Sequence, residues 1–389
     1  MTYHFDTSLI RDVPGSFLRQ TPDPAPAPQL LVLNHALGAA LGFDPDQLQS
    51  QAAGWFSGAT AMPGADPVTL AYAGHQFGGF SPVLGDGRAH LLGELITPTG
   101  QRLDLQLKGS GRTAFSRGGD GKAAIGPMLR EYLISEAMAA LGVPTTRALA
   151  VVATGQNIRR DAGPVPGAVL ARVAASHIRV GTFQFFSSRG DTDGLRALTD
   201  HTLARHYPGV TSALGLFDAV AVAQARLIAQ WMGLGFVHGV MNTDNMALSG
   251  ETIDYGPCAF IDAYSPGAVF SSIDRQGRYA LANQPLILGW NLARLAEALL
   301  PLIDPDGEKA VQIANDRLQG IAALYQVEWL AVMRRKLALD GAAEADASLI
   351  DDLLATLPGA DWTLFFYHLA AAATGDDSAL ADVPDRAAL

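Results

Sequence analysis

Two short stretches near the middle of the chain decide how the rest of it is interpreted. The first is His238-Gly239-Val240-Met241-Asn242-Thr243-Asp244-Asn245, and Asp254-Tyr255-Gly256 begins nine residues after Asn245. Asn245 offers an amide oxygen and Asp254 a carboxylate, which are the hard oxygen ligands that suit Mg²⁺ bridging phosphate groups. A polar turn between two buried segments contains the same residue types, so the remaining chain has to discriminate between these two interpretations.

The spacing of the two stretches is that of the protein-kinase loop His-Arg-Asp-x-x-x-x-Asn followed by the metal-binding element Asp-Phe-Gly. In such loops the third residue is the Asp that accepts the substrate proton, and here that position is Val240. The pattern predicts a nucleotide-binding kinase fold that contains its metal ligands and lacks its usual base. Asp244 is a candidate proton acceptor, although a surface Asp in the turn Asn-Thr-Asp-Asn would give the same sequence.

Three upstream elements occur in the order that this fold requires. The turn Gly85-Asp86-Gly87-Arg88 precedes a strand and can bring backbone amides close to phosphate oxygens. Lys108 ends the strand-like run 102–108, on the face opposite its leucines, and a predicted helix follows it. That helix carries Glu131 and Glu136, and periodicity does not say which of them pairs with Lys108.

Other candidates carry weaker signals. Arg172 and Arg179 lie seven residues apart and could clamp a phosphate with their guanidinium groups, although isolated arginines are usually surface residues. His238 is interpreted as a support of its loop, and Cys258 as a buried, inert side chain. The common order of glycine loop, lysine, helix glutamate, His-to-Asn loop and Asp-x-Gly favours a phosphate site over a set of unrelated turns.

The two halves of the chain differ in their hydrophobic patterns. The expected strands are residues 89–96, 102–108, 147–153 and 168–174, and the expected helices are 30–41, 127–141, 214–232, 286–302, 310–337 and 362–373. We therefore predict an α+β, protein-kinase-like two-lobed fold. Its predicted parts are an N-terminal extension (1–70), a sheet-rich N-lobe (71–185) and a mostly helical C-lobe (186–389) with the catalytic and metal-binding loops.

Composition narrows the class of protein. The 389 residues are 49% hydrophobic and 17% charged, as in an ordinary globular enzyme, and the net charge of −11 argues against a nucleic-acid partner. The single cysteine excludes a disulfide within the chain and fits a reducing compartment. No secretory signal and no run of about 18 uninterrupted apolar residues is found, so we expect a cytoplasmic protein without a membrane partner.

At this point the motifs match a known family. The chain resembles the selenoprotein O family, also called YdiU, whose members are protein adenylyltransferases with a pseudokinase fold. The matching stretches are Tyr72–Gly78, Leu84–Arg88, Gln106–Thr113, Arg130–Met138, Gly142–Arg147, Ala171–Phe183, His238–Met246 and Ile253–Pro257. Members of this family often carry a C-terminal cysteine or selenocysteine, whereas Cys258 is the one cysteine here, so we expect no redox gating by a disulfide within this chain.

The resemblance implies a role for each candidate residue. ATP would lie inverted relative to a kinase, with Lys108 on the phosphates and paired with Glu131. The γ-phosphate would lie between Arg172 and Arg179. Asn245 and Asp254 would hold Mg²⁺ or Mn²⁺, with Asp244 as proton acceptor. The remaining nucleotide contacts would come from Gly85, Gly87, Arg88, Asp120 and Gly121.

The implied reaction is transfer of AMP from ATP to a Ser, Thr or Tyr hydroxyl of a protein, with release of pyrophosphate. The resemblance also suggests a close variant, transfer of UMP from UTP with Mn²⁺. Two alternatives stay open: an ordinary kinase-type phosphotransferase, and a catalytically inactive ATP-binding scaffold. The sequence names neither the protein substrates nor the oligomeric state.

Overall fold

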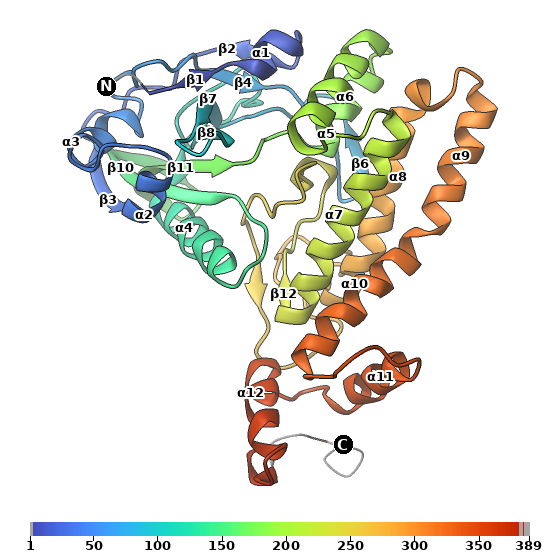
Figure 1. The fold of residues 1–389 in the computed structure, drawn as a ribbon. Helices are drawn as coiled ribbons and strands as arrows, with labels where there is room; N and C mark the ends of the chain where they lie inside the picture. The colour runs from blue at the N-terminus through green and yellow to red at the C-terminus, as the bar shows by residue number, and fades with distance from the viewer. Residues whose placement is uncertain (1–2, 381–383, 385–389) are drawn as a thin grey trace. The chain divides into compact units, whose positions relative to one another are not determined.

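The computed structural model describes residues 3–380 and Pro384, and its central element is a nine-stranded sheet whose neighbouring strands are antiparallel. The main strand order is β2-β4-β7-β8-β11-β10-β3, with β1 beside β7 and β9 beside β11 (Figure 1). The strands are β1 (Phe5–Asp6), β2 (Phe17–Arg19), β3 (Gln29–Leu33), β4 (Val68–Leu70), β7 (Ala89–Ile96), β8 (Arg102–Lys108), β9 (Ala123–Ala124), β10 (Arg147–Arg160) and β11 (Gly163–Ala174). The predicted mixture of strands and helices is confirmed.

The chain forms two compact units, and each is described separately. The first comprises residues 1–216, 242–255 and 294–310, and the second comprises 217–241, 256–293 and 311–389. The nine-stranded sheet lies entirely in the first unit. The predicted domain limits at residues 70 and 185 stay a prediction.

Alternation along β8 sorts its side chains onto two faces of the sheet. Leu105 and Leu107 are fully buried in a core with helices α2 (His35–Ala40) and α3 (Pro45–Trp55). The opposite face carries the polar residues Asp104, Gln106 and Lys108, as expected for a period of two. One face of β8 therefore packs in the hydrophobic core, and the other face presents polar side chains.

Helix α4 (Ile125–Ala140) covers the second face of the sheet beside β10 and β11 (Figure 1). Its buried Met128 packs against Val151 and Leu170 of those strands. The helix lies close to its predicted limits, and its buried face combines apolar and polar residues: Met128, Glu131, Ser135 and Met138. The same packing directs Glu131, which is 2% exposed, into the unit.

The expected helix at 30–41 is wrong in its first half. Residues Gln29–Leu33 form β3, which pairs with β10, and only His35–Ala40 is helical. Asn34 begins the helix, because its side-chain oxygen accepts a hydrogen bond from Leu37 N at 3.0 Å. The leucines of this segment fit a helical period, but its first half pairs with the edge of the sheet at β10 and is therefore a strand.

The other elements of the first unit are α1 (Ser8–Asp12), the hairpin of β5 (Gly74–Gln76) and β6 (Gly79–Ser81), α5 (Val180–Ser187), α6 (Thr192–His206) and the turn η1 (Thr243–Asn245). The remaining elements are the pair β12 (Phe236–Val237) and β13 (Ala259–Phe260), η2 (Leu281–Asn283), η3 (Asp377–Leu380) and the helices α7 (Ala213–Leu234), α8 (Gln284–Ile303), α9 (Gly307–Gln319), α10 (Ile321–Lys336), α11 (Asp346–Thr356) and α12 (Trp362–Ala372). The single helix predicted at 310–337 is wrong, because Gly320 separates α9 from α10. In the second unit, Trp362 packs with Val237 and Ile261.

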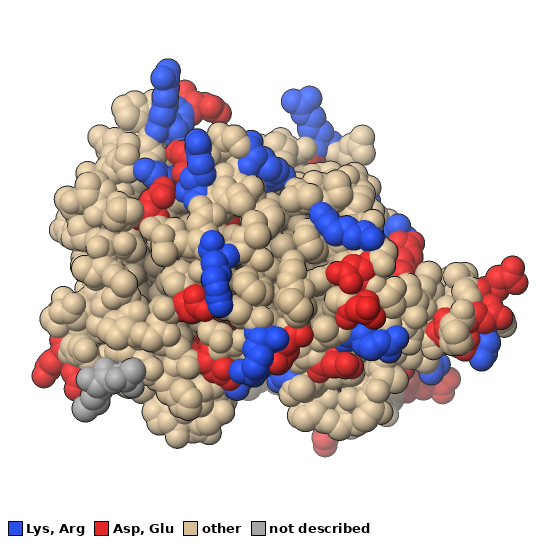
Figure 2. Space-filling view, turned by 90° about the horizontal axis from the view of Figure 1, so that it is seen from above, with Lys and Arg blue, Asp and Glu red and all other residues tan. Residues whose placement is uncertain are grey.

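Two helices, Ala213–Leu234 and Leu281–Ile303, are long and apolar enough to cross a membrane by length and composition alone. Core helices of soluble proteins pass the same test, so this is weak evidence for a membrane span. On the face drawn in Figure 2, basic and acidic side chains are interspersed, and no continuous basic surface is seen among the residues described there.

Candidate functional site

Three cations of the first unit converge on the carboxylate of Asp254. Lys108 Nζ lies 2.6 Å from Oδ1, Arg172 Nη1 lies 2.6 Å from the same oxygen, and Arg179 Nη1 lies 2.6 Å from Oδ2. Lys108 Nζ also donates to Glu131 Oε2 at 2.6 Å. Both arginine side chains are only 2% exposed. Such a concentration of buried positive charge is a strong electrostatic feature for a chain with an overall negative charge.

The sheet register brings two of these cations together. Strands β8 and β11 are antiparallel, with Gln106 opposite Arg172 and Lys108 opposite Leu170. Lys108 and Arg172 therefore lie on one face of adjacent strands, two residues apart along the register. Gln106 fixes the guanidinium of Arg172 by accepting a hydrogen bond from Nη2 at 2.5 Å.

Loops supply the other two members of the cluster. Arg179 immediately precedes α5, where its backbone N donates to Thr182 Oγ1 at 3.1 Å. Asp254 has a backbone φ of 63°, in the left-handed region that non-glycine residues rarely adopt. Such strained positions concentrate at functional sites, because surrounding contacts must hold them in place.

The helix glutamate that contacts Lys108 is Glu131. Glu136, the alternative left open by periodicity, instead accepts two hydrogen bonds from the Arg147 guanidinium, at 2.9 and 2.7 Å. The packing of α4 against the sheet therefore gives the two glutamates different partners: Lys108 for Glu131 and Arg147 for Glu136. Arg172 Nη1 also donates to Glu131 Oε1 at 3.3 Å. Lys108 and Arg172 therefore each contact both carboxylates, Glu131 and Asp254.

The charges keep Asp254 ionised. Burial acts to raise the pKa of Asp254, but the three cations together hold it well below its usual value. Burial raises the pKa of Asp86 to about 6, although Arg179 and Arg172 partly offset that shift. Asp86 lies 3.9 Å from Arg179 Nη2 and accepts a hydrogen bond from Gln106 at 2.9 Å.

Two buried donors of the cluster lack a hydrogen-bond partner. These are the Nε atoms of Arg172 and Arg179. Unsatisfied buried donors are costly, so these two atoms leave each guanidinium with an unused capacity to donate. Phosphate oxygens suit these atoms, because guanidinium groups bind phosphates through parallel N–H donors.

Asp244 lies beside the cluster. Its backbone carbonyl accepts a hydrogen bond from Arg179 Nη1 at 2.6 Å, and its Oδ2 accepts one from Gln76 Nε2 at 3.0 Å. The second carboxylate oxygen, Oδ1, is buried and has no hydrogen-bond partner. Burial raises the pKa of Asp244, which makes this carboxylate a better proton acceptor. Asn245 follows in the same turn, η1, and is half-buried.

The predicted glycine loops lie around the cluster. Gly85 has a φ of +60°, and a Cβ atom there would lie 2.2 Å from the Phe115 ring, so no larger residue fits. Gly87 follows Asp86 in this loop. Arg88 is exposed, and its carbonyl accepts a hydrogen bond from Gly109 N at 2.7 Å.

Asp120 and Gly121 belong to the loop that follows β8. Asp120 pairs with Arg160 at 2.8 Å, and the carbonyl of Gly121 accepts a hydrogen bond from Gly111 N at 3.0 Å. The structure therefore places these two residues outside the charged cluster, in a loop that begins directly after Lys108.

Sequence reasoning missed four side chains that shape the site. Gln106 and Asp86 hold the arginines, Gln76 holds Asp244, and the ring of Tyr72 lies 4.7 Å from the Arg179 guanidinium carbon. Gln106 could have been found from the sequence, because it lies two residues from Lys108 and therefore on the same face of the predicted strand. The other three are brought in by loop folding, which periodicity does not encode.

The residues fit a divalent ion that arrives with phosphate. Among the described residues, no three His, Cys, Asp or Glu side chains form a metal-binding group. Mg²⁺ in nucleotide enzymes is commonly held by one or two protein oxygens together with substrate phosphates. The side-chain amide oxygen of Asn245 and the carboxylate of Asp254 are oxygen donors of that kind.

Comparisons with known proteins agree along nearly the whole chain. The family profile described as "Protein adenylyltransferase SelO" matches residues 3–382. Relatives named "Protein nucleotidyltransferase YdiU" include one from Cereibacter sphaeroides, 60% identical over 100% of this chain and 82% of the relative. A second, from Rhizobium rhizogenes, is 56% identical over 96% of this chain and 76% of its own length. A third, from Methylorubrum populi, is 55% identical over 97% and 77%. The chain belongs to the SelO family of protein adenylyltransferases.

Proposed function

We propose that this protein transfers AMP from ATP to a hydroxyl group of a protein and releases pyrophosphate. The observation that carries the proposal is the cluster of Lys108, Arg172 and Arg179 around Asp254, with two buried arginine Nε atoms unpaired. A triphosphate would bring negatively charged oxygens to these three cations. Family membership gives the class of reaction, protein nucleotidyl transfer.

The two arginines support an inverted nucleotide. Arg172 and Arg179 are buried, and Arg179 lies 3.9 Å from Asp86 in the glycine-containing loop. Two buried guanidinium groups are a poor environment for an uncharged base and a good one for terminal phosphates. With the γ-phosphate held there, the α-phosphate would face outward from the cluster. Lys108 would neutralise charge along the triphosphate while Glu131 holds its amine in place.

A divalent ion, Mg²⁺ or Mn²⁺, would be held by Asp254 and Asn245 with the help of the phosphates. It would supply positive charge against the departing pyrophosphate. Asp244, which has an unpaired oxygen and a raised pKa, would accept the proton of the attacking hydroxyl. Ser, Thr and Tyr side chains of proteins are the acceptors that this chemistry suits.

We also infer a kinase-like two-lobed arrangement and a cytoplasmic location. Family membership and the order of Lys108, Glu131, the His238–Asn245 loop and Asp254 support the first inference. The single cysteine and the composition support the second. The domain limits 1–70, 71–185 and 186–389 belong to the same proposal.

Label position tests the reaction. Incubation with ATP and Mg²⁺ and a mixture of acceptor proteins should leave label from α-labelled ATP on protein, with a mass gain equal to one AMP. Label retained only from the γ-position would overturn the proposal in favour of phosphoryl transfer. Binding of ATP without any transfer, under Mg²⁺ and under Mn²⁺, would indicate an inactive scaffold, and transfer from UTP alone would indicate uridylylation.

A further inference from the structure

The turn that carries Arg179 is held from outside by side chains of the first unit and by the backbone of residues 246–248. Leu248 N donates to the Ile178 carbonyl at 2.9 Å, and Val180 N donates to the Met246 carbonyl at 3.0 Å. Residues 175–179 connect β11 to α5 and form no regular structure of their own. Ala175 N donates to Glu251 at 2.9 Å, and Ser176 Oγ lies 2.7 Å from His206 Nε2. Because the turn has little internal support, the place of Arg179 depends on those outside contacts.

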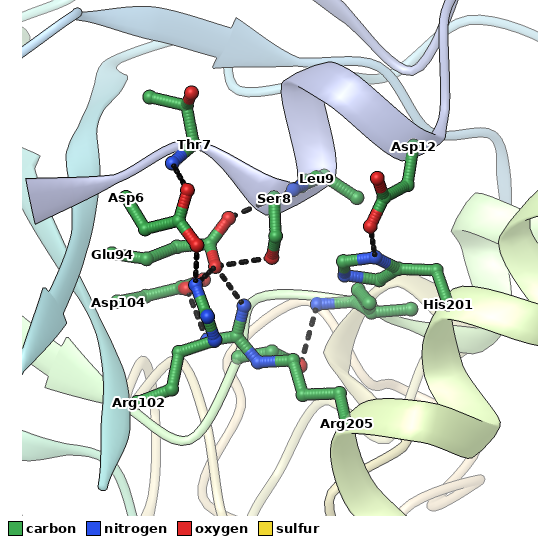
Figure 3. Close-up of polar contacts among 12 residues, drawn as sticks. Asp6, Thr7, Ser8, Leu9, Asp12, Glu94, Arg102, Asp104, His201 and Arg205 are labelled. Carbon is green, nitrogen blue, oxygen red and sulfur yellow. Dashed lines mark hydrogen bonds and ion pairs between the residues drawn. The ribbon is translucent and has the colours of Figure 1, made fainter. Parts of the chain in front are cut away.

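Asp104 and Arg205 supply several of the side-chain contacts that hold the first half of the turn. Asp104 Oδ2 accepts hydrogen bonds from both His177 N and His177 Nδ1, each at 2.9 Å. Arg205 donates to the carbonyl of Ala175 through Nε at 2.9 Å and Nη2 at 2.6 Å. Arg205 Nη2 also donates to Asp104 Oδ1 at 2.6 Å, which links the two supports (Figure 3).

The Asp104–Arg205 pair is buried, so water cannot replace a hydrogen bond that either side chain loses. The side chains of Asp104 and Arg205 are 3% and 5% exposed. Burial tends to raise the pKa of Asp104, but Arg205 and His177 hold it well below its usual value, so the group is a carboxylate. Burial lowers the pKa of His177 to about 4, so the ring is neutral and its Nδ1–H must donate to that carboxylate. One arrangement of donors and acceptors satisfies the turn.

The same network extends away from the site. Arg205 Nη1 lies 3.0 Å from Glu94 Oε2, and Glu94 accepts hydrogen bonds from Ser8 Oγ, Leu9 N and Arg102 Nη1 at 2.5, 2.8 and 2.8 Å. Figure 3 shows these groups gathered around Glu94 between β7, β8 and the N-terminal segment. Arg102 shares Glu94 with Arg205 and has no recorded contact with residues 175–179.

We propose that Asp104 and Arg205 are positioning residues that place Arg179 for nucleotide binding, which rests on the proposed function of the site. Neither touches the nucleotide site: each acts through the turn, two to four residues before Arg179. A long side chain amplifies a small backbone rotation at its head group, and a misplacement of about 1 Å in a binding group can cost roughly 100-fold in rate.

The test uses conservative variants of the full chain. Asp104→Asn preserves shape but presents an amide where two N–H donors need an acceptor, and Arg205→Lys removes the fork that joins Ala175 to Asp104. We expect each to weaken ATP binding by about tenfold or more, measured well below the melting temperature. The matched control is Arg102→Lys, which alters the same network without touching the turn and should bind ATP like the parent.

A double-substitution cycle separates positioning from general damage. If Asp104 acts through Arg179, then Asp104→Asn should add little to the loss of ATP affinity already caused by Arg179→Lys. Equal losses in the presence and absence of the Arg179 substitution would overturn the proposal. So would an Arg102→Lys variant that binds ATP as weakly as Arg205→Lys.

Hydrogen exchange tests the proposal independently of nucleotide chemistry. Asp104→Asn and Arg205→Lys should accelerate exchange of the amides at 176–180, while Arg102→Lys leaves them protected. If the parent protein binds no ATP, the proposed function fails, and exchange still decides whether this pair holds the turn. Unchanged protection at 176–180 in both variants would contradict the positioning role.

Discussion

At the scale of single residues, the site is organised by one carboxylate that serves several cations. Asp254 forms ion pairs with Lys108, Arg172 and Arg179 at distances of 2.6 Å. Removing one partner of a buried ion pair usually costs about 3–5 kcal/mol, because the remaining charge stays buried and unpaired. Asp254 is therefore needed both for the stability of the site and for the chemistry.

The Asp254→Asn substitution should have opposite effects on binding and on transfer. Loss of the carboxylate leaves Glu131 as the remaining partner of Lys108 and Arg172 and takes the carboxylate away from Arg179, so the net positive charge rises and metal-free ATP should bind several-fold more tightly. Transfer should fall by roughly 10²–10³-fold, because the charge that holds the metal is gone. Equilibrium binding in EDTA and the rate of α-label incorporation measure the two effects.

The control removes a carboxylate of similar size from a surface pair. Asp66→Asn breaks the exposed contact with Arg19 and should change neither quantity. Inorganic triphosphate should also raise the melting temperature of Asp254→Asn by more than it raises that of the parent. Weaker ATP binding by Asp254→Asn in EDTA would contradict the charge-balance argument.

Metal affinity should depend on nucleotide. Asp254 Oδ1 already accepts hydrogen bonds from two cations and Oδ2 from one, so Mg²⁺ has to approach this carboxylate against three neighbouring positive charges. Phosphates provide alternative partners for those cations and additional oxygens for the metal. Calorimetric titration with Mg²⁺ should show no saturable binding at millimolar concentration until ATP or a non-hydrolysable analogue is added. Tight binding of Mg²⁺ by the protein alone would contradict this account.

The sequence could predict the charged residues of the site but not the groups that orient them. Spacing on β8 and order along the chain single out Lys108 and Asp254, because these depend on local patterns. Glu131 and Glu136 could not be told apart, since their separation depends on how α4 packs against the sheet. Asp86 was missed because its contact with Arg179 spans residues 86 to 179 and arises only in the folded unit.

At the scale of elements, the loop after β8 depends on close contact between two glycine-containing segments. Gly121 has a φ of +68°, and a Cβ atom there would lie 2.0 Å from the carbonyl oxygen of Gly111. The hydrogen bond from Gly111 N to Gly121 O closes the loop directly beyond Lys108. Its backbone is therefore fixed by an approach that only glycine allows.

Gly121→Ala should destabilise the first unit by about 3 kcal/mol or more and weaken ATP binding, because the clash forces the two segments apart. Gly118→Ala is the matched control. Its φ is +84°, but no atom lies within 4 Å of an added Cβ, so it should cost about 1–2 kcal/mol through backbone strain alone and leave ATP affinity intact. Thermal melts and equilibrium binding compare the pair, and equal effects would contradict a role for the contact.

Strands with a clear alternation of apolar and polar residues were predicted well, whereas strands that are ordered only by pairing with a neighbouring strand were not. The strands β7 and β8 were predicted at their observed limits, 89–96 and 102–108, because their alternation is a local pattern. β10 and β11 extend further toward residues 160 and 163 than their apolar runs, since cross-strand pairing continues through polar residues. The strands β1, β2 and β4 are too short to show a period and are ordered by pairing with the sheet.

At the scale of the whole molecule, stability should depend on pH through a half-buried acid near the Arg179 turn. Burial raises the pKa of Glu251 to about 7 from 4.5, although hydrogen bonds from Ser249 and Ala175 N oppose the shift. Between these two values the folded chain binds more protons than the unfolded chain, so the free energy of unfolding falls as pH rises. The loss begins near pH 4.5 and levels off above about pH 7.

Glu251→Gln should remove this dependence, because a neutral amide oxygen can accept the same two hydrogen bonds without carrying charge. At pH 8 the variant should be more stable than the parent by about 1–3 kcal/mol, and at pH 4.5 the two should be nearly equal. Thermal melts between pH 4.5 and pH 8 measure the difference, and the low-pH point is the internal control. A gap that is already complete at pH 4.5 would mean that the substitution acts through packing and not through the proton. A variant less stable at pH 8 would show instead that the ionised carboxylate is the form that the Ala175 turn requires.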